Sequence, residues 1–341
     1  MSREGVGKRK AIVTGGGGFL GRAIIRKLLE GGYEVANYSR GDYPELRKMG
    51  VKVIRGDLSN LEETKRAFKG FDVVFHVAAK VGYWGKKDDY WKVNVEGTKN
   101  VIEACLQNKI KELVFTSSPS VIFDGKDMEG VDESVPYPKE YDSPYSESKA
   151  EAERILLAAN SEQLRTISLR PHLIWGPGDT HLIPAIIERA KKGKITRIGK
   201  GNNIADMVYV DNAADAHVLA DRALRDNPDC RGKAFFISND DPQNVWEFID
   251  RLASLAGAKP ITRSVPTNLA FVGAVFTEAF YKMFKKGKDP PLSRFLVREL
   301  STSHWYDISA AKKELGFVPK VSIEEGLKKL KKWIDGGMRG N

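Results

Sequence analysis

The chain has 341 residues, 41% hydrophobic and 29% charged, and its 55 Lys and Arg against 45 Asp and Glu give a formal charge of +10. This composition excludes an integral membrane protein, a collagen-like chain and a disordered polyelectrolyte, and it fits a soluble α/β chain. Two cysteines, Cys105 and Cys230, are too few for a disulfide framework, so we expect a reducing, cytoplasmic location. The positive balance leaves a nucleic-acid or anionic-membrane partner open at this point.

Apolar β-branched runs alternate with amphipathic segments in the first half, which predicts a parallel sheet with crossover helices. Strands are expected at residues 10–14, 34–38, 51–55, 72–77, 112–116 and 166–169. Helices are expected at residues 20–30, 61–68, 90–108 and 145–160. Right-handed crossovers then give one doubly wound sheet, the Rossmann arrangement of the α/β class, open to a ligand at its carboxyl edge.

The pattern loosens after Pro171, where Pro–Gly breaks at residues 176–178 and a basic helix at 183–192 indicate that the chain leaves the sheet. It is expected to return at residues 207–210 and 234–238, and from about residue 245 it is mainly helical without strand spacing. We therefore predict a Rossmann domain over residues 1–175, with returning segments at about 206–240. Residues 176–205 and 241–341 form a smaller, mainly helical domain in this prediction.

A glycine-rich turn lies between the first strand and the first helix, with Gly15, Gly18 and Gly21 at GxxGxxG spacing. Glycine there lets the backbone turn tightly and approach a pyrophosphate at the helix N-terminus. A flexible turn is the alternative, but the strand–loop–helix context favours dinucleotide binding. We expect Gly15, Gly18, Phe19, Leu20 and Gly21 to contact the dinucleotide.

The second strand ends at Ser39 and Arg40, where an acidic residue would select NAD by accepting the ribose hydroxyls. Arg40 would instead pair with a 2′-phosphate, which favours NADP, although it could also be a solvated surface arginine. Asp57 and Leu58, after the third strand, are expected at the adenine edge, and Asp57 could equally cap a helical turn.

Tyr145 and Lys149 lie four residues apart, on one face of the expected helix. A phenol titrates near pKa 10, and a neighbouring ammonium favours its ionised form, which suits acid–base work. The spacing alone usually marks a solvated helix face. Ser118 adds weight because it follows the fifth strand, whose carboxyl end should meet the start of this helix.

The glycine loop, the Ser118/Tyr145/Lys149 set, His76-Val77-Ala78-Ala79, Asn94-Val95-Glu96-Gly97-Thr98 and Leu169-Arg170-Pro171 together resemble the extended short-chain dehydrogenase/reductase family over nearly the whole chain. The resemblance implies that Tyr145 is the catalytic acid/base, Ser118 binds the reacting oxygen and Lys149 tunes the tyrosine and binds the nicotinamide ribose. It implies a supporting role for Asn94, while Ser117 is the nearest rival to Ser118. Further implied cofactor contacts are Val77, Ala78, Ala79, Lys80, Ser117, Tyr145, Lys149 and Pro171.

Ala205 stands where sugar-nucleotide epimerases usually carry an arginine for the diphosphate, which argues against that subclass. Tyr83, Trp84, Phe123, Trp175 and the stretch 269–284 supply apolar surface, although each could be core. The chain also resembles the 3β-hydroxysteroid dehydrogenase-like group, which includes reductases of long-chain 2-alkyl-3-oxoalkanoates in bacterial olefin biosynthesis. The segments that carry this resemblance are residues 40–44, 76–85, 117–121, 173–179, 291–296 and 304–306. This implies NADPH-dependent reduction of the 3-keto group of a long-chain β-keto acid. Expected substrate contacts are Tyr83, Trp84, Ser120, His172 and Trp175, with Lys80 or His172 toward the carboxylate.

Two other functions stay open. One is an NAD(P)-dependent 3β-hydroxysteroid or sterol-4α-carboxylate 3-dehydrogenase, and the other is a non-catalytic NADP-sensing protein. Five scattered histidines give no metal-ligand spacing, and dispersed basic residues argue against nucleic acid. The resemblance implies a homodimer through the helices at 90–108 and 145–160. Lys282, Lys285, Lys286 and Lys288 beside the apolar stretch suggest contact with other olefin-pathway enzymes or peripheral association with an anionic membrane.

Overall fold

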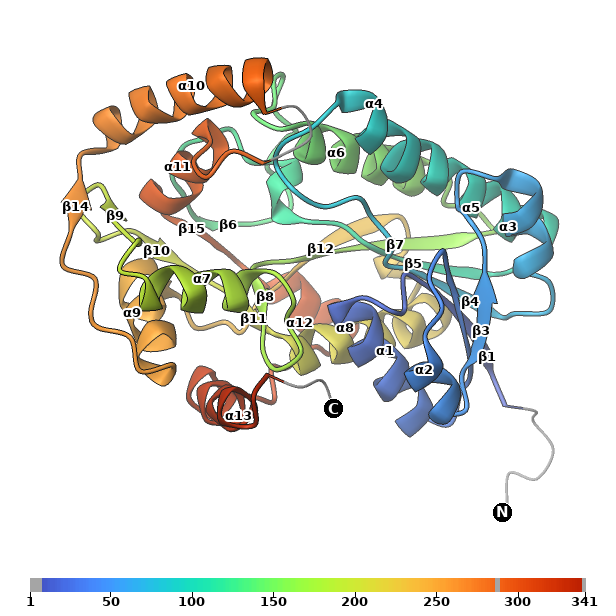
Figure 1. The fold of residues 1–341 in the computed structure, drawn as a ribbon. Helices are drawn as coiled ribbons and strands as arrows, with labels where there is room; N and C mark the ends of the chain where they lie inside the picture. Colours follow the sequence, from blue (N-terminus) through green and yellow to red (C-terminus); the bar gives the residue numbers. More distant parts are fainter. Residues whose placement is uncertain (1–7, 286–288, 339–341) are drawn as a thin grey trace.

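The computed structural model describes residues 8–285 and 289–338. At its centre is a seven-stranded sheet in the order β12-β7-β5-β4-β1-β2-β3, with every neighbouring pair parallel (Figure 1). The strand order runs outward in both directions from β1, so the predicted doubly wound sheet is confirmed. Its strands are β1 (Lys10–Thr14), β2 (Glu34–Ser39), β3 (Lys52–Arg55), β4 (Val73–His76), β5 (Glu112–Thr116), β7 (Arg165–Pro171) and β12 (Lys233–Ile237).

Helices cover both faces of this sheet, as crossover connections require (Figure 1). One face carries α1 (Phe19–Glu30) and α8 (Val210–Asp226), and the other carries α3 (Leu61–Ala67), α5 (Gly97–Gln107) and α6 (Pro144–Ala158). Side chains of β1 alternate between the two cores: Ala11 and Val13 pack in the cluster that contains α1, and Ile12 packs in the cluster that contains α5. Both faces of the sheet are therefore dry, and the strand ends are where a ligand can reach it.

The helix expected at residues 90–108 is in three parts. These are α4 (Lys87–Tyr90), a π-helical segment η1 (Trp91–Glu96) and α5. Just after the π-helical segment, the hydroxyl of Thr98 in α5 donates to the carbonyl oxygen of Asn94 at 2.6 Å. A π-helical segment of this kind shifts the register of one helix face, here the face that carries Asn94.

The remaining elements are shorter sheets and helices around this central sheet. A four-stranded sheet has the order β13-β10-β15-β6, β11 pairs with β8, and β14 pairs with β9. The short strands are β6 (Met128–Val131), β8 (Ile174–Trp175), β9 (Arg197–Ile198), β10 (Ile204–Ala205), β11 (Val208–Tyr209), β13 (Gln243–Asn244), β14 (Ser264–Val265) and β15 (His304–Tyr306). The helices are α2 (Pro44–Lys48), η2 (Pro119–Val121), α7 (Leu182–Lys191), η3 (Pro228–Cys230), α9 (Val245–Leu255), α10 (Thr267–Phe284), α11 (Arg294–Ser301), α12 (Ser309–Leu315) and α13 (Ile323–Asp335).

Two expectations for the second half need correction. The segment at 207–210 returns as β11 beside β8, outside the seven-stranded sheet, whereas the segment at 234–238 returns as β12 at the sheet edge. The stretch after residue 245 is mainly helical, but the expectation that it lacks strands is wrong, because β14 and β15 lie there. Strands of two or three residues are too short to show a period of two in sequence.

Within the described ranges, no helix is long and apolar enough to cross a membrane. Cys105 and Cys230 are both buried and unpaired.

Candidate active site

A cavity of about 650 Å³ follows the carboxyl ends of β1, β2, β3, β4, β5 and β7. Every predicted cofactor contact except Lys80 lines it. These residues are Gly15, Gly18, Phe19, Leu20, Gly21, Ser39, Arg40, Asp57, Leu58, Val77, Ala78, Ala79, Ser117, Tyr145, Lys149 and Pro171. The motifs found separately in the sequence therefore meet along one edge of the sheet.

The glycine loop joins β1 to α1 at one end of the cavity. Gly15 has φ +71°, and a Cβ there would lie 2.8 Å from the Cα of Ala78. A Cβ on Gly21 would overlap the carbonyl oxygen of Gly15. Gly18 is the N-cap of α1 and offers no side chain, so the first backbone N–H groups of the helix are left for an anionic ligand. This cradle fits the pyrophosphate of a nicotinamide dinucleotide.

Arg40 and Asp57 lie at the ends of neighbouring strands, β2 and β3. Arg40 is exposed, and no ion pair between described residues involves it. The pKa of Asp57 is lowered, mainly by the hydrogen bond from the Ser59 backbone N–H and also by the charge of Arg40. Arg22, the other arginine near the loop, donates to the Gly17 carbonyl at 2.9 Å and pairs with Glu45 at 2.7 Å. Of the two arginines, Arg40 is the one that lines the cavity.

Ser118, Tyr145 and Lys149 line the middle of the cavity. Ser118 caps η2, and its Oγ accepts from the Ser120 backbone at 3.2 Å. Tyr145 is in the first turn of α6, which begins at Pro144 after the capping residue Ser143. Lys149 follows one turn later, and its Nζ donates to the Thr116 carbonyl oxygen at 2.6 Å. The helix start and the end of β5 thus bring the three side chains to one place.

Burial controls the protonation of this set. It raises the pKa of Tyr145 to about 12, against a smaller lowering by the Ser118 hydroxyl. Burial lowers the pKa of Lys149 to about 7, and the charge of Glu153 partly opposes this. Lys149 is not among the groups that shift the tyrosine here. At neutral pH, Tyr145 is therefore a protonated phenol, poised to donate rather than to accept a proton.

Asn94 does not line the cavity. It is buried, and its amide bridges the backbone of Lys80 (2.7 and 3.1 Å) to the Ser148 hydroxyl (2.9 Å), next to Lys149. Lys80 is also absent from the cavity wall, and its Nζ lies 5.0 Å from the centroid of the Tyr90 ring. The geometry makes Asn94 a positioning residue between the segment after β4 and α6.

The predicted substrate contacts divide into two groups. Tyr83, Ser120 and His172 line the cavity. The Tyr83 ring lies edge-on to Tyr145 (6.4 Å between centroids) and stacks on Phe295 of α11 (4.4 Å). The other two, Trp84 and Trp175, do not line it.

Trp175 is fully buried in the core, with its ring against Tyr209 and Phe248. This position does not support the expectation that Trp175 contacts a substrate. The sequence could not show this, because an aromatic residue on a short apolar strand has the same pattern in the core as at a pocket. Sequence reasoning missed Phe295, Glu299 and Tyr306, which line the cavity from α11 and β15, and His304, which packs behind them. Phe295, His304 and Tyr306 lie in segments that carry the family resemblance, but no local motif gives any of these four residues a role in the site.

Comparison with known proteins gives the family. The sequence profile of the 3-beta hydroxysteroid dehydrogenase/isomerase family matches residues 12–266. A 2-alkyl-3-oxoalkanoate reductase of Shewanella oneidensis is 46% identical over 94% of this chain and 85% of its own length. The same-named protein of Stenotrophomonas maltophilia is 45% identical over 94% and 98%. A decarboxylating sterol-4-alpha-carboxylate 3-dehydrogenase of Mus musculus is 34% identical over 94% and 90%.

Among solved structures, the UDP-glucose 4-epimerase of Thermus thermophilus, in complex with NAD, superposes with a TM-score of 0.73 at 27% identity, over 96% of this chain and 99% of that one. The fold and the site thus define an oxidoreductase of the extended short-chain dehydrogenase/reductase class, acting on CH–OH or C=O groups. The chain belongs to the 3-beta hydroxysteroid dehydrogenase/isomerase family.

Proposed function

We propose that this protein uses NADPH to reduce the 3-keto group of a long-chain 2-alkyl-3-oxoalkanoate, giving the 2-alkyl-3-hydroxyalkanoate, as a cytoplasmic step of olefin biosynthesis. The observation that carries the proposal is the meeting of Ser118, Tyr145 and Lys149 in the cavity that the glycine loop enters. Identities of 45–46% to two 2-alkyl-3-oxoalkanoate reductases support the substrate class.

The residues around the cavity fit a nicotinamide dinucleotide, because the glycine loop leaves space for a pyrophosphate where a Cβ would collide. Such a cofactor would supply the hydride. The Ser118 hydroxyl donates a hydrogen bond to the carbonyl oxygen of the substrate and fixes its orientation. Tyr145 then gives its phenolic proton to the same oxygen, since an alcohol is a weaker acid than a phenol. Lys149 lies one turn further along α6 and would bind the nicotinamide ribose of the cofactor.

The preference for NADPH is proposed from Arg40. Its exposed guanidinium lies at the end of β2 without an ion-pair partner among the described residues, where it can pair with a 2′-phosphate.

We also propose that two regions of the chain bind the cofactor and the substrate separately. Residues 1–175 and about 206–240 hold the cofactor, while residues 176–205 and 241–341 supply the substrate side. The cavity lining by Phe295 and Glu299 supports this division.

The test is to follow NADPH and NADH oxidation with a panel of 2-alkyl-3-keto acids of different chain length. Tyr145→Phe should abolish turnover and keep NADPH affinity unchanged, because only the proton donor is lost. If the variant retains activity, or if no keto acid is reduced by the wild-type protein, the proposal fails.

A second candidate is oxidation and decarboxylation of a sterol-4α-carboxylate, which is favoured by relatives of that name at 34–35% identity. Both candidates use a β-hydroxy acid/β-keto acid couple in opposite directions. Incubation with NAD⁺ or NADP⁺ and a sterol-4α-carboxylic acid distinguishes them, since only the second candidate predicts release of CO₂.

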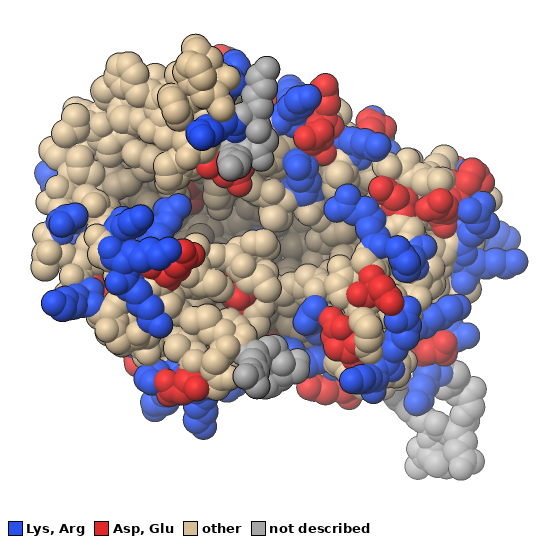
Figure 2. Space-filling view, viewed as in Figure 1, with Lys and Arg blue, Asp and Glu red and all other residues tan. Residues whose placement is uncertain are grey.

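We also propose a homodimer through the helical faces of α5 and α6, and peripheral association with an anionic membrane through α10. The proposed membrane association is supported by the burial pattern of α10, which is the reverse of that of an ordinary surface helix. The buried residues of α10 are Ala270, Ala274 and Glu278, while most of its large apolar side chains are exposed and Phe271 is half-buried. Figure 2 shows that the surface over α10 is mostly uncharged. Lys282 and Lys285 lie toward its end, whereas Lys286 and Lys288 lie outside the described residues. The exposed residues are Leu269, Val272, Val275, Phe276, Phe280, Met283 and Phe284.

A further inference from the structure

We propose that His76 is a positioning residue for the cofactor, and that it fixes residues 77–80, which follow β4, against the glycine loop. The inference rests on the proposed function in one respect, the binding of a nicotinamide dinucleotide, and does not depend on the substrate. His76 is the last residue of β4, is only 1% exposed and does not line the cavity. The next three residues, Val77, Ala78 and Ala79, do line it. His76 can therefore act on a ligand only through the residues that it holds in place.

The hydrogen bonds of Thr98 determine which nitrogen of His76 carries the proton. The Thr98 hydroxyl donates its single hydrogen to the carbonyl oxygen of Asn94 at 2.6 Å. Its oxygen can therefore only accept from His76 Nε2, which lies 3.0 Å away. Burial, and after it the charge of Lys149, lower the pKa of His76 to about 3, so the ring is uncharged at neutral pH. Nε2 then carries the proton and Nδ1 offers a lone pair.

The lone pair on Nδ1 orients the hydroxyl of Thr14, the last residue of β1. Nδ1 accepts from this hydroxyl at 2.8 Å, so the Thr14 oxygen keeps both of its lone pairs for other donors. It accepts from the backbone N–H groups of Val77 and Ala78, each at 3.2 Å. A charged ring would present a second N–H to Thr14, whose oxygen already accepts twice. The neutral ring is thus the form that fits this arrangement, and residues 77 and 78 are bound to it through one hydroxyl.

The segment after β4 is held at both of its ends. At the first end, the backbone of Ala78 packs on the glycine loop, since a Cβ on Gly15 would lie 2.8 Å from the Ala78 Cα. At the second end, the amide of Asn94 accepts from the Lys80 N–H at 2.7 Å and donates to the Lys80 carbonyl oxygen at 3.1 Å. The carbonyl oxygen of Asn94 belongs to the same chain of hydrogen bonds as His76, which therefore connects the two ends. A shift of the ring would move residues that line the cavity next to the glycine loop.

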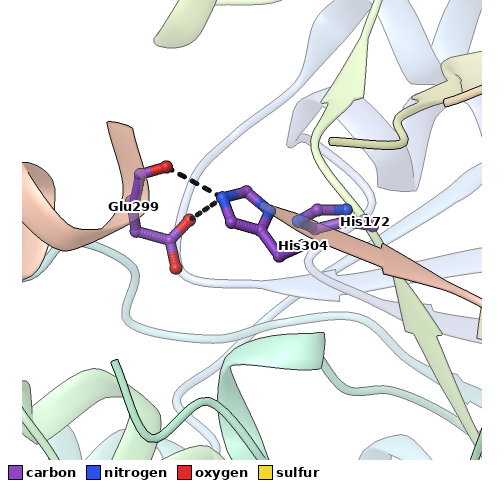
Figure 3. A group of neighbouring side chains, drawn as sticks. All are labelled: His172, Glu299 and His304. Carbon is purple, nitrogen blue, oxygen red and sulfur yellow. Dashed lines mark hydrogen bonds and ion pairs between the residues drawn. The ribbon is translucent and has the colours of Figure 1, made fainter. Parts of the chain in front are cut away.

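The complete bonding of His76 distinguishes it from two other buried histidines, His172 and His304. Figure 3 shows these two rings side by side, with Glu299 beyond His304. His304 Nε2 donates to the Glu299 carbonyl oxygen at 2.8 Å, whereas its buried Nδ1 makes no hydrogen bond to any described residue. Both ring nitrogens of His76 are bonded, so its ring has a single orientation and a single tautomer. A residue that positions others needs such a defined orientation.

The experiment breaks the bond between His76 and Thr14 from each side and measures Kd for NADPH and for NADH by fluorescence titration, without substrate. In His76→Gln the amide nitrogen can keep the bond to Thr98, but no acceptor remains for Thr14, and Thr14→Val removes the hydroxyl with little change of shape. We expect each variant to raise Kd about tenfold, because residues 77 and 78 lose their link to the ring. The double variant should stay within about twofold of the worse single variant, since both substitutions break the same link. Thr14→Ser, which keeps the hydroxyl, should restore the wild-type Kd.

Tyr33→Phe is the matched control, because it removes a buried hydrogen bond of 2.7 Å to Asp221 from a residue that does not line the cavity. It should lower the melting temperature and leave Kd unchanged. If His76→Gln and Thr14→Val behave like this control, the role of His76 is structural and the proposal is overturned. Independent effects that add in the double variant would overturn it as well.

A second measurement uses the wild-type protein and does not depend on how the variants fold. NMR of protein labelled with ¹⁵N-histidine should show His76 as the neutral Nε2–H tautomer from about pH 5 to 8. His217 is the internal reference for the opposite tautomer, because its Nδ1 bonds to the Ala213 carbonyl oxygen at 2.7 Å. A proton on Nδ1 of His76, or titration of His76 in this range, would overturn the proposed arrangement.

The titrations also separate this inference from the proposed function. Weakened dinucleotide binding in the two variants, together with a wild-type protein that reduces no keto acid, would support the role of His76 and refute the proposed function alone. A wild-type protein that binds neither NADPH nor NADH would overturn both.

Discussion

Replacing Arg40 with alanine isolates the part of cofactor binding that depends on the 2′-phosphate. A charge-assisted hydrogen bond contributes roughly 1.5–3 kcal/mol, and the exposure of Arg40 places its contribution at the lower end. A loss of about 1.4 kcal/mol corresponds to tenfold, so kcat/KM with NADPH should fall about tenfold. Arg40 offsets the negative charge of Asp57 in the wild type. Without Arg40, this carboxylate repels the 2′-phosphate and lowers the affinity for NADPH further. NADH has no 2′-phosphate, and its kcat/KM should not fall.

The assay is the ratio of kcat/KM for NADPH to that for NADH, measured with one keto acid at low ionic strength, where screening is weakest. Arg55→Ala is the matched control, because Arg55 is an exposed arginine at the end of the neighbouring strand β3 and does not line the cavity. An unchanged ratio in Arg40→Ala, or an equal change in Arg55→Ala, would refute the role of Arg40.

Three further outcomes follow from the geometry. Burial lowers the pKa of Lys149 from 10.5 to about 7, so the folded state bears the cost of a buried ammonium below pH 7 and loses it as the pH rises toward 10. The melting temperature of Lys149→Met minus that of the wild type should therefore be more positive at pH 6 than at pH 9. A difference that is larger at pH 9, measured by calorimetry, would contradict this. Gly21→Ala should weaken NADPH binding at least tenfold by fluorescence titration, since its Cβ would overlap Gly15 and shift the loop. The double variant Phe276→Asp/Phe280→Asp should abolish sedimentation with anionic vesicles and keep activity toward short soluble substrates; undiminished sedimentation would exclude α10 as the contact.

The cofactor end of the cavity could be predicted because its signals are local. The glycine loop connects consecutive elements, and Tyr145 and Lys149 are one helical turn apart, so a short window of sequence contains each arrangement. The position of Ser118 beside them could also be predicted, because parallel strands have their carboxyl ends at the same edge of the sheet. The widened helix around Asn94 escaped prediction, because a π-helical segment has the same apolar pattern as an ordinary helix.

The substrate end could not be predicted in this way, because tertiary contacts between distant segments build it. Trp175 is one example. In sequence, an aromatic residue after β7 is equally compatible with a pocket and with the core. In the structure, its ring packs against Tyr209 and Phe248 in the core. His304 is a second example. It reaches His172 only because β15 pairs with β6 and β10, and a three-residue strand carries no readable period. The position of His304 is therefore set by the four-stranded sheet and not by the seven-stranded sheet whose strand ends carry the glycine loop and Ser118.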